Sequence, residues 1–438
     1  MLWRWGEGKA VADTNNPTFR EAVGVFARIG VMSFGGPAAQ IALMHRVLVD
    51  ERKWLAEPMF LSALSFCMLL PGPEAMQLAT YAGWRLHGVR GGLVAGLLFV
   101  APGAAVVLAL AMIYAAYGNL PVVAALFLGI KSAVLVIVIE ALLRIARRAL
   151  KLPEHWVIAA LAFAGLFLFG QPFPLIIGAA ALFGYFGGGS GGKPTPFDGG
   201  AVPLGATIRT VAAWGAVWAA PLLALAALLG PQHVLTQLGW FFSKLAIVTF
   251  GGAYAVLAYM AQDVVAQYHW LTPGEMVDGL GLAETTPGPL ILVIEFVGYL
   301  AAYRAGGMGS GLLGALVTLW ATFAPCFLWI FTFAPYLEWI NAQARLRSAL
   351  AAITAAVVGV ILNLAVWFAV HVFFARVGVA GVGPLHVLAP EFSSIDGRVA
   401  GLSLLSGYLL LWRHWDVPRV LAVAAAGSII IWGQTLVR

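Results

Sequence analysis

The chain has 438 residues, of which 61% are hydrophobic and only 10% are charged, and its mean hydropathy is +0.91. A soluble protein carries roughly a quarter charged residues, so the composition excludes an ordinary soluble domain and indicates a polytopic membrane protein. The formal net charge of +6 arises mostly from basic residues in short connections between apolar segments. Such residues are topology signals, so we expect a lipid bilayer around the chain and no nucleic-acid partner.

Helices rather than strands are expected to cross the bilayer. Apolar runs such as 91–117 and 120–143 exceed the roughly 20 residues that a transmembrane helix needs, and the ten-residue alternation of a membrane barrel is missing. We therefore predict an all-α integral membrane protein, a polytopic helical bundle. Residues 1–16 are polar and lack the pattern of a removable signal peptide. Two isolated cysteines, Cys67 and Cys326, make no disulfide framework and no metal site, so no cofactor is expected.

Residues 1–187 are predicted to form an N-terminal membrane repeat, and residues 188–207 a linker rich in Gly and Pro. The apolar segments of this first half lie at 22–46, 58–84, 91–117, 120–143, 154–170 and 172–187.

Residues 208–438 are predicted to form a C-terminal membrane repeat with one extra leading helix at 208–230. The segment order of the first half then returns, and a loop at 378–397 interrupts the last part. The repeated segments lie at 238–261, 274–302, 309–333, 348–375, 398–412 and 417–436.

The two halves share motifs at a constant offset of 216 residues. The nine residues RIGVMSFGG at 28–36 correspond to KLAIVTFGG at 244–252, and each segment is followed by a Trp-Leu pair and a Pro-Gly-Pro. The Trp-Leu pairs are Trp54-Leu55 and Trp270-Leu271, and the Pro-Gly-Pro motifs are Pro71-Gly72-Pro73 and Pro287-Gly288-Pro289. After a seven-residue insertion the offset becomes 223, which pairs Pro102 with Pro325, Ile130 with Ile353 and Glu140 with Asn363.

The basic residues of the first half orient the segments. They fall on connections that we expect in the cytoplasm, namely Arg46, Arg52, Lys53, Arg85, Arg90, Arg144, Arg147, Arg148 and Lys151. The segments 22–46 and 58–84 then cannot each be a single crossing, so we expect broken or re-entrant helices. The connection 262–270 contains Asp263 and no Lys or Arg, which places it outside. We predict two inverted repeats, with a cytoplasmic N-terminus and an external C-terminus.

Two cations occupy matching positions ahead of the glycine pairs. Arg28 and Lys244 each stand near the start of an apolar run. A cation in or near hydrocarbon faces a cavity or a partner, or reaches the membrane interface as a snorkelling side chain. Because the charge is duplicated in both halves, we predict that both residues bind substrate.

Each cation is followed, five residues later, by a hydroxyl, a phenylalanine and two glycines. Ser33 and Thr249 can donate to an anion or re-satisfy backbone groups that a break sets free. Glycine pairs let the backbone leave helical geometry or let two helices pack closely. We include both hydroxyls and the pairs in the predicted site: Gly35, Gly36, Gly251 and Gly252.

Each Pro-Gly-Pro motif is predicted to end one half-helix and begin another, since Pro at a first helical position wastes no N–H group. The new helix N-terminus leaves free amides and about half a positive charge, which suits an anion; a purely structural kink is the alternative. The predicted substrate-binding residues here are Pro71, Gly72, Pro73, Gln77, Pro287, Gly288 and Pro289.

Three carboxylates lie near these breaks and are predicted to serve coupling or gating. They are Glu74, Glu284 and Glu295. Glu74 can instead complement the helix dipole. Lys131 and Glu140 are further polar residues inside a predicted span.

The Phe-Gly-Gly segment, the Trp-Leu pair and the Pro-Gly-Pro motif, each present twice, resemble the chromate ion transporter family in its long, two-domain form. The likeness covers nearly the whole chain and is strongest at 26–103 and 242–325, including the run PGPEAMQLATYAG that begins at Pro71. The resemblance implies an inner-membrane protein that exports chromate from the cytoplasm, with sulfate as a close mimic. It also implies drive by the membrane potential or a proton gradient.

Other functions remain open at this point. A sulfate or other oxyanion transporter, or an anion channel on the same scaffold, fits the same residues, and the oligomeric state is open, a homodimer included. An intramembrane enzyme is disfavoured because no nucleophile has a histidine partner. A nucleotide-binding loop of the Gly-x-x-x-x-Gly-Lys-Ser/Thr type is missing, which disfavours an ATP-driven pump.

Overall fold

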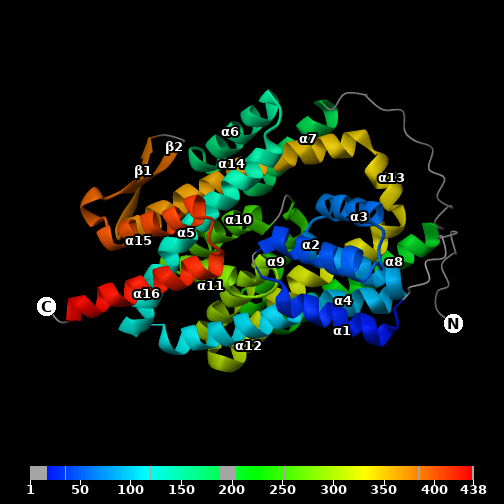
Figure 1. Cartoon of the computed structure of the whole chain (residues 1–438), viewed down its shortest axis with the longest axis horizontal. Coiled ribbons are helices and arrows are strands. Elements are labelled where there is room, and N and C mark those ends of the chain that lie inside the picture. The colour runs from blue at the N-terminus through cyan, green and yellow to red at the C-terminus, as the bar shows by residue number, and fades with distance from the viewer. Residues whose placement is uncertain are drawn as a thin grey trace.

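A computed structural model describes residues 17–34, 36–118, 120–187, 204–250, 253–382 and 385–436. The fold is a bundle of helices (Figure 1), which confirms the predicted all-α class. The elements of the first half are α1 (Phe19–Met32), α2 (Gly36–His45), the π-helical turn η1 (Arg46–Glu51), α3 (Glu57–Leu69), α4 (Glu74–Tyr117), α5 (Pro121–Ala149), α6 (Pro153–Phe167) and α7 (Phe173–Gly187).

The second half adds one leading helix and then continues in the same order. Its elements are α8 (Leu204–Leu229), α9 (Val234–Val248), α10 (Ala253–Ala266), α11 (Pro273–Thr285), η2 (Leu290–Leu292), α12 (Val293–Phe333), η3 (Ala334–Tyr336), α13 (Leu337–Ala342), α14 (Ala344–Phe373), η4 (Phe392–Ser394), α15 (Gly397–Gly407), η5 (Tyr408–Trp412) and α16 (Val417–Leu436). Of the predicted linker, residues 188–203 lie outside the described residues, and 204–207 begin α8.

The segment 378–397, predicted as a loop, contains a small antiparallel hairpin. Strands β1 (Val377–Val382) and β2 (Leu385–Pro390) pair from Val377 with Pro390 to Val382 with Leu385. Three of the six residues of β1 are valines, whose β-branched side chains favour strands. The Pro and Ser residues of the segment indicate a loop, but the valines of β1 favour extended backbone and allow the two strands to pair.

Five helical stretches among the described residues are long and apolar enough to cross a membrane. They are α4, α5, α8, the run from η2 to η3 (Leu290–Tyr336) and α14. Helix α5 alone has 29 residues, which corresponds to about 43 Å at a rise of about 1.5 Å per residue and exceeds the roughly 30 Å hydrocarbon core. The chain is therefore a multi-pass membrane protein.

The predicted segments 22–46 and 58–84 are both broken in the structure. The first ends α1 at Met32 and resumes as α2 at Gly36, where the glycine has a φ of +77°. The second ends α3 at Leu69 and resumes as α4 at Glu74. Both breaks fall at the glycine pair and the Pro-Gly-Pro motif from which they were predicted.

The first half contains two helical hairpins, one formed by α1 and α2 and the other by α3 and the first part of α4. Each hairpin starts and finishes on the same side of the molecule. Arg52 Nη1 lies 3.1 Å from Glu21 Oε1, so η1 returns to the start of α1. The rings of Phe19 and His87 are 5.5 Å apart, so the first part of α4 also ends beside the start of α1. We call this side of the molecule the cationic face, defined by residues 19–21, 46–57 and 85–90.

Helices α4 and α12 each reverse direction at a glycine. Helical geometry is lost at His87 and at Gly88, which has a φ of +62°, and again at Gly306 and at Gly307, which has a φ of +73°. These positions fall in the gaps between the predicted segments, 85–90 and 303–308. A positive φ is readily adopted only by glycine, so the same residue type makes the same reversal in both halves.

The second part of α4 then runs away from the cationic face. Gly103 packs against the backbone oxygen of Pro287, which belongs to the second Pro-Gly-Pro turn. Further along, the Tyr114 hydroxyl donates a 2.7 Å hydrogen bond to Asp278 in α11. We call this second side the opposite face, defined by residues 114–121 and 267–275.

The second part of α12 runs in the reverse sense. It starts after Gly307, places Cys326 beside Gly72 of the first Pro-Gly-Pro turn, and places Phe331 against Gly92 near the cationic face. The hairpin of α11 and α12 therefore reaches its turn from the opposite face, whereas the hairpin of α3 and α4 reaches its turn from the cationic face.

The short helices at the end of each half pack against the long helix of the other half. Helix α5 packs against α15 and α16, and α14 packs against α6 and α7. Glycines permit the close approaches, because a Cβ atom at Gly129 would collide with Ala424 and one at Gly359 with Ala159. Ser428 in α16 donates to the Ala125 oxygen at 2.6 Å, so the described chain ends at the opposite face.

Candidate functional site

The two Pro-Gly-Pro turns and the two hydroxyl-Phe-Gly-Gly breaks are joined by reciprocal hydrogen bonds between the halves. The Gly72 N–H donates to the Thr249 oxygen at 2.9 Å, and the Gly288 N–H donates to the Ser33 oxygen at 2.7 Å. Gly72 and Gly288 have φ values of +122° and +89°. Each half therefore supplies one break and one turn to two matched junctions inside the bundle.

The hydroxyls of the two breaks are turned toward their own helices. Ser33 Oγ donates to the Ile29 oxygen at 2.6 Å, and Thr249 Oγ1 donates to the Leu245 oxygen at 2.5 Å. Both residues are buried. In this conformation the hydroxyls satisfy carbonyl groups that the breaks set free, and a change of χ1 is needed before either can donate to an anion.

Two buried glutamines complete the turns. Gln77 Nε2 donates to the Pro71 oxygen at 2.7 Å, and Gln40 Nε2 donates to the Gly288 oxygen at 2.6 Å. Their Oε1 atoms have no hydrogen-bond partner among the described residues. Gln77 was predicted, whereas Gln40 was not, because the offset of 216 places an apolar Val256 at its counterpart position.

There is little free space around the turns. A Cβ atom at Gly72 would lie 2.8 Å from Gln77 Nε2 and 3.0 Å from Cys326 Sγ, and one at Gly288 would lie 2.9 Å from a Leu292 methyl group and 3.2 Å from Gly103 Cα. A larger side chain at Gly72 must therefore displace the side chains of Gln77 and Cys326, and one at Gly288 must displace Leu292 or the backbone at Gly103.

The two turns lead into different helix starts. Helix α4 begins directly at Glu74 after Pro73, and no side chain caps its first amides. The second turn is followed by a buried 3-10 turn, η2, before α12 begins at Val293. Both motifs were expected to be followed at once by an α-helix with free amides and a positive dipole end. Of the two turns, only the first leads directly into such a helix, α4.

The three predicted carboxylates have different surroundings. Glu74 is half-buried at the start of α4. Glu284, at the end of α11, accepts a 2.9 Å hydrogen bond from the Tyr254 hydroxyl. Glu295 in α12 is only 1% exposed, and its Oε2 atom has no hydrogen-bond partner among the described residues. The coupling and gating roles of all three stay predictions.

A pair of charges on α5 lies near Glu284. Glu140 and Arg144 are hydrogen-bonded to each other one helical turn apart, and Arg144 interacts electrostatically with both Tyr254 and Glu284. Tyr254 was not predicted, since its position just after the second glycine pair matches an apolar Ala38 in the first half. These four side chains form a polar group between the second turn and the end of α5 that carries the basic residues.

The predicted cations lie on exposed surfaces of their hairpins. Arg28 lines a small cavity together with Arg46 and Glu51. The Lys244 ammonium lies 5.6 Å from the ring centroid of Tyr259. The structure thus brings neither cation into the reciprocal junctions, and their role as substrate contacts stays a prediction. Gly35, Gly251 and Gly252 lie outside the described residues.

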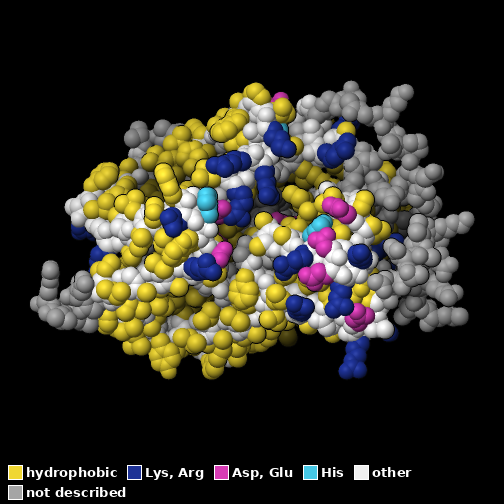
Figure 2. Space-filling view, in the orientation of Figure 1, with side chains coloured by type: hydrophobic (Ala, Val, Ile, Leu, Met, Phe, Trp, Pro, Cys, Tyr) yellow, Lys and Arg dark blue, Asp and Glu magenta, His cyan; other side chains and the backbone are white. Residues whose placement is uncertain are grey.

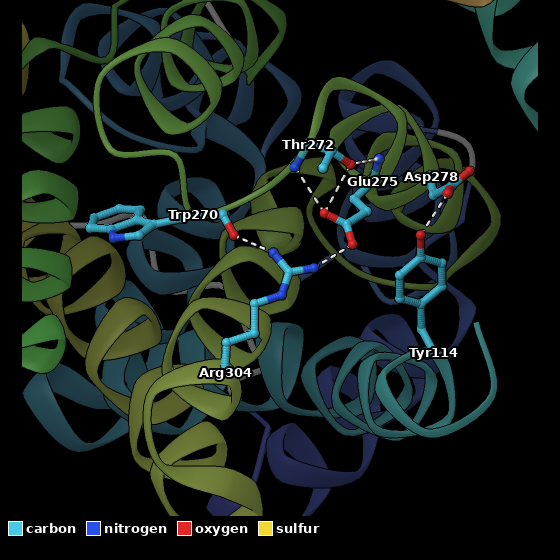
Figure 3. A network of polar contacts seen from close by, with 6 residues as sticks. All are labelled: Tyr114, Trp270, Thr272, Glu275, Asp278 and Arg304. Atoms are coloured by element: carbon cyan, nitrogen blue, oxygen red, sulfur yellow. Dashed lines mark hydrogen bonds and ion pairs between the residues drawn. The ribbon is translucent and has the colours of Figure 1, made fainter. Parts of the chain in front are cut away.

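A second polar network, which the sequence indicates only in part, lies nearer the opposite face (Figure 3). Asp278 in α11 accepts from the Tyr114 hydroxyl at 2.7 Å and lies 3.1 Å from the Lys131 ammonium. Asp278 is only 5% exposed. Lys131 stands out in the sequence as a polar residue inside a span, but its partner belongs to the other half and no local pattern connects them.

Helix α11 carries a further ion pair one turn earlier. Glu275 pairs with Arg304 of α12, whose Nη1 also donates to the Trp270 oxygen at 2.5 Å (Figure 3). Glu275 caps its own helix as well, because it accepts from the Thr272 N–H at 2.8 Å while the Thr272 hydroxyl accepts from the Glu275 N–H. This reciprocal cap fixes where α11 begins.

Comparison with known proteins places these features in a family. The family described as Chromate transporter matches residues 20–185 and 236–431. A chromate transport protein of Pseudomonas aeruginosa is 34% identical over 344 residues, 77% of each chain. One of Cupriavidus metallidurans is 29% identical over 420 residues, 94% of this chain and 93% of the relative. A probable chromate transport protein of Synechococcus elongatus is 28% identical over 419 residues, 93% of this chain and 94% of the relative.

No solved structure matches the chain. The family match covers most of both predicted halves and confirms the resemblance drawn from the duplicated motifs. The relatives are named as transport proteins, in keeping with the transmembrane helices described above. The chain therefore belongs to the chromate transporter family.

Proposed function

We propose that this protein is a secondary transporter that exports chromate from the cytoplasm. The observation that carries this proposal is the pair of reciprocal junctions, at each of which the Pro-Gly-Pro turn of one half meets the hydroxyl-Phe-Gly-Gly break of the other half. Family membership supplies the substrate class. Broken helices that meet at the bilayer midplane are the setting in which many secondary transporters bind their substrates.

The proposed substrate site lies at the first turn of α4. A tetrahedral dianion requires hydrogen-bond donors and positive charge, and the uncapped amides after Pro73 offer both through the helix dipole. Gln77 and the hydroxyl of Thr249 are the neutral groups at this junction that would complete the shell after they rotate away from their present acceptors. Ser33 is the corresponding hydroxyl at the other junction, beside Gly288. Sulfate shares the shape and charge of chromate and is the expected competitor.

The proposed orientation puts the cationic face in the cytoplasm. Six basic residues of the first half belong to the segments that define that side: Arg20, Arg46, Arg52, Lys53, Arg85 and Arg90. Figure 2 shows Lys and Arg side chains over the centre and right of one face, with hydrophobic side chains along its left and lower edges. On the opposite face Arg304 pairs with Glu275, and in the β1–β2 region Arg376 pairs with Glu391. An excess of Lys and Arg marks the cytoplasmic side. The N-terminus is then cytoplasmic, the C-terminus external, and the membrane is the inner membrane.

We further propose that the two halves are inverted repeats and that transport proceeds by alternating access. The opposed entry of the two hairpins supports this arrangement. Export also fits the energetics, because each negative charge that leaves an inside-negative cell gains about 2.3 kcal/mol per 100 mV. A dianion gains about twice that amount, so the membrane potential alone can drive export.

Counterflow separates this proposal from an anion channel on the same scaffold. Proteoliposomes preloaded with unlabelled chromate should take up labelled chromate faster than empty ones, because a carrier returns to the loading face more readily with substrate bound. Sulfate inside the vesicles should produce the same acceleration. Equal uptake by preloaded and empty vesicles at zero potential, from protein shown to be inserted, would favour the channel.

A further inference from the structure

Helices α3 and α11 lead into the two Pro-Gly-Pro turns, and we call them the first arm and the second arm. The N-terminal part of the second arm, α11, is joined to three other helices by ion pairs and hydrogen bonds. Asp278 joins it to α4 through Tyr114 and to α5 through Lys131, and Glu275 joins it to α12 through Arg304. Glu275 and Asp278 are three residues apart, so they lie on neighbouring parts of one side of the helix.

The corresponding arm of the first half, α3, carries no charges at the equivalent positions. The offset of 216 places Met59 and Ser62 where α11 has Glu275 and Asp278, and the offset of 223 places Thr354 where α5 has Lys131. None of these three side chains carries a charge, so no ion pair can form between them. The asymmetry lies in the residues themselves and does not depend on the conformation of the chain.

Packing shows the same asymmetry. Helix α11 packs against α4, α5, α10, α12, α14 and α16, whereas α3 packs mainly against α4 and α13. On α3 the side chains of Leu61 and Met68 are 48% and 56% exposed. The end of α3, at Leu69 and Leu70, borders an apolar cavity of about 660 Å³. The first arm, α3, is therefore packed less tightly than the second arm, α11.

A buried ion pair in a membrane-spanning region costs desolvation and persists only where both charges find partners. Asp278 is nearly fully buried and has two partners, one neutral and one cationic. Removing either charge leaves the other without compensation.

We propose that Lys131 and Asp278 form a latch that holds the opposite face of the transporter closed. When the latch is closed, α11 lies against α4 and α5 and blocks access from the opposite face to the second turn. When it opens, α11 moves and the turn becomes reachable from that face. This inference rests on the proposed alternating access, but its test needs no transported substrate.

The test measures how fast a membrane-impermeant maleimide reaches the turn from each face. Both native cysteines are replaced (Cys67→Ser, Cys326→Ser), and Thr285→Cys, beside the turn, supplies the reporter thiol. A separate variant with His269→Cys, an exposed position on the opposite face, identifies the vesicle preparation in which that face is outward. Labelling is then compared with and without Asp278→Asn.

We expect Asp278→Asn to raise the labelling rate from the opposite face by about tenfold. A change of about this factor is typical when one interaction shifts the equilibrium between two conformations. Glu391→Gln is the matched control, because it breaks an exposed ion pair with Arg376 and should leave labelling unchanged. The exchange Lys131→Asp with Asp278→Lys should restore slow labelling, since it keeps the attraction and reverses the charges.

Unchanged labelling in Asp278→Asn would overturn the latch, whether or not the protein transports chromate. Lys131→Gln is the second variant if Asp278→Asn does not accumulate in the membrane, since it leaves the carboxylate bound to Tyr114. Fast labelling in both single variants and in the charge exchange would assign the pair a packing role and would likewise overturn the proposal. Failure of chromate uptake with the predicted labelling pattern would affect only the proposed substrate.

Discussion

At the residue scale, the decisive atoms are the backbone N–H groups of Gly72 and Gly288. Each donates across the boundary between the halves, and each glycine has a positive φ that other residues adopt at a cost. The sequence indicated that both motifs were breaks, because Pro-Gly-Pro cannot continue a helix. It could not indicate the acceptors, since Ser33 and Thr249 are each far away in the chain from the glycine they bind.

Replacing either turn glycine by leucine should therefore abolish transport. A side chain at Gly72 meets Gln77 and Cys326, and one at Gly288 meets Gly103, so both junctions would be pushed apart. We expect initial chromate uptake to fall by about a hundredfold in each variant, the scale that misplacement by about 1 Å produces. Gly170→Ala is the control, because Gly170 also has a positive φ but has open space around it. Near-normal uptake by Gly72→Leu would remove the junction from the site.

The two predicted cations call for a different readout, because Arg28 and Lys244 lie on exposed surfaces. Charges there attract an anion through solvent, and salt screens that attraction. We expect Arg28→Gln and Lys244→Gln to raise the KM for chromate at low ionic strength by several-fold, with a smaller difference at high ionic strength. Identical kinetics of both variants and the parent would assign the cations to the membrane interface.

At the element scale, the reversals inside α4 and α12 turn two long apolar stretches into hairpins. The polar gaps 85–90 and 303–308 indicate where the reversals lie, and the glycines at 88 and 307 explain why the chain can turn there. The packing of α5 against α15 and α16 was beyond prediction from the sequence. It depends on small residues such as Gly129 meeting Ala424, and nothing local records that pairing.

The reversal at Gly88 gives a clean test of backbone strain, because a Cβ atom there would meet nothing within 4 Å. A non-glycine residue would be destabilised only by its backbone conformation, because a φ of +62° with a ψ of −154° is nearly restricted to glycine and costs other residues about 1–3 kcal/mol. We expect the thermal unfolding temperature in detergent to be lower for Gly88→Ala and for Gly88→Val than for the parent, since neither residue readily adopts this combination of φ and ψ. Gly178→Ala, at a helical glycine with open surroundings, should not lower it. Equal stability of all variants would contradict the assigned reversal.

The polar network of α11 shows where reasoning from the sequence stops. Asp278 and Lys131 each stand out as a charge within an apolar segment, but they come from different halves and are 147 residues apart. The repeat offset does not connect them, because the network has no counterpart at the equivalent positions of α3. Only the folded arrangement shows that the two charges neutralise each other.

At the scale of the whole molecule, two hairpins that enter from different faces meet at shared junctions, and the basic residues concentrate toward one face. For the proposed export of an anion, an inside-negative potential supplies the direction, because it drives negative charge outward. The duplicated motifs were enough to predict two related halves. The offset of 219 between Gly88 and Gly307, intermediate between 216 and 223, indicates that the seven-residue insertion is divided between two places.

The most direct test of chromate export is uptake of labelled chromate into inside-out vesicles, with and without an imposed potential that is positive inside the vesicle. We predict saturable uptake that the potential accelerates and that excess sulfate suppresses. Vesicles containing the Gly72→Leu protein at equal abundance should show only the background rate. Absence of chromate uptake by correctly inserted parent protein, under a verified potential, would contradict the proposed function.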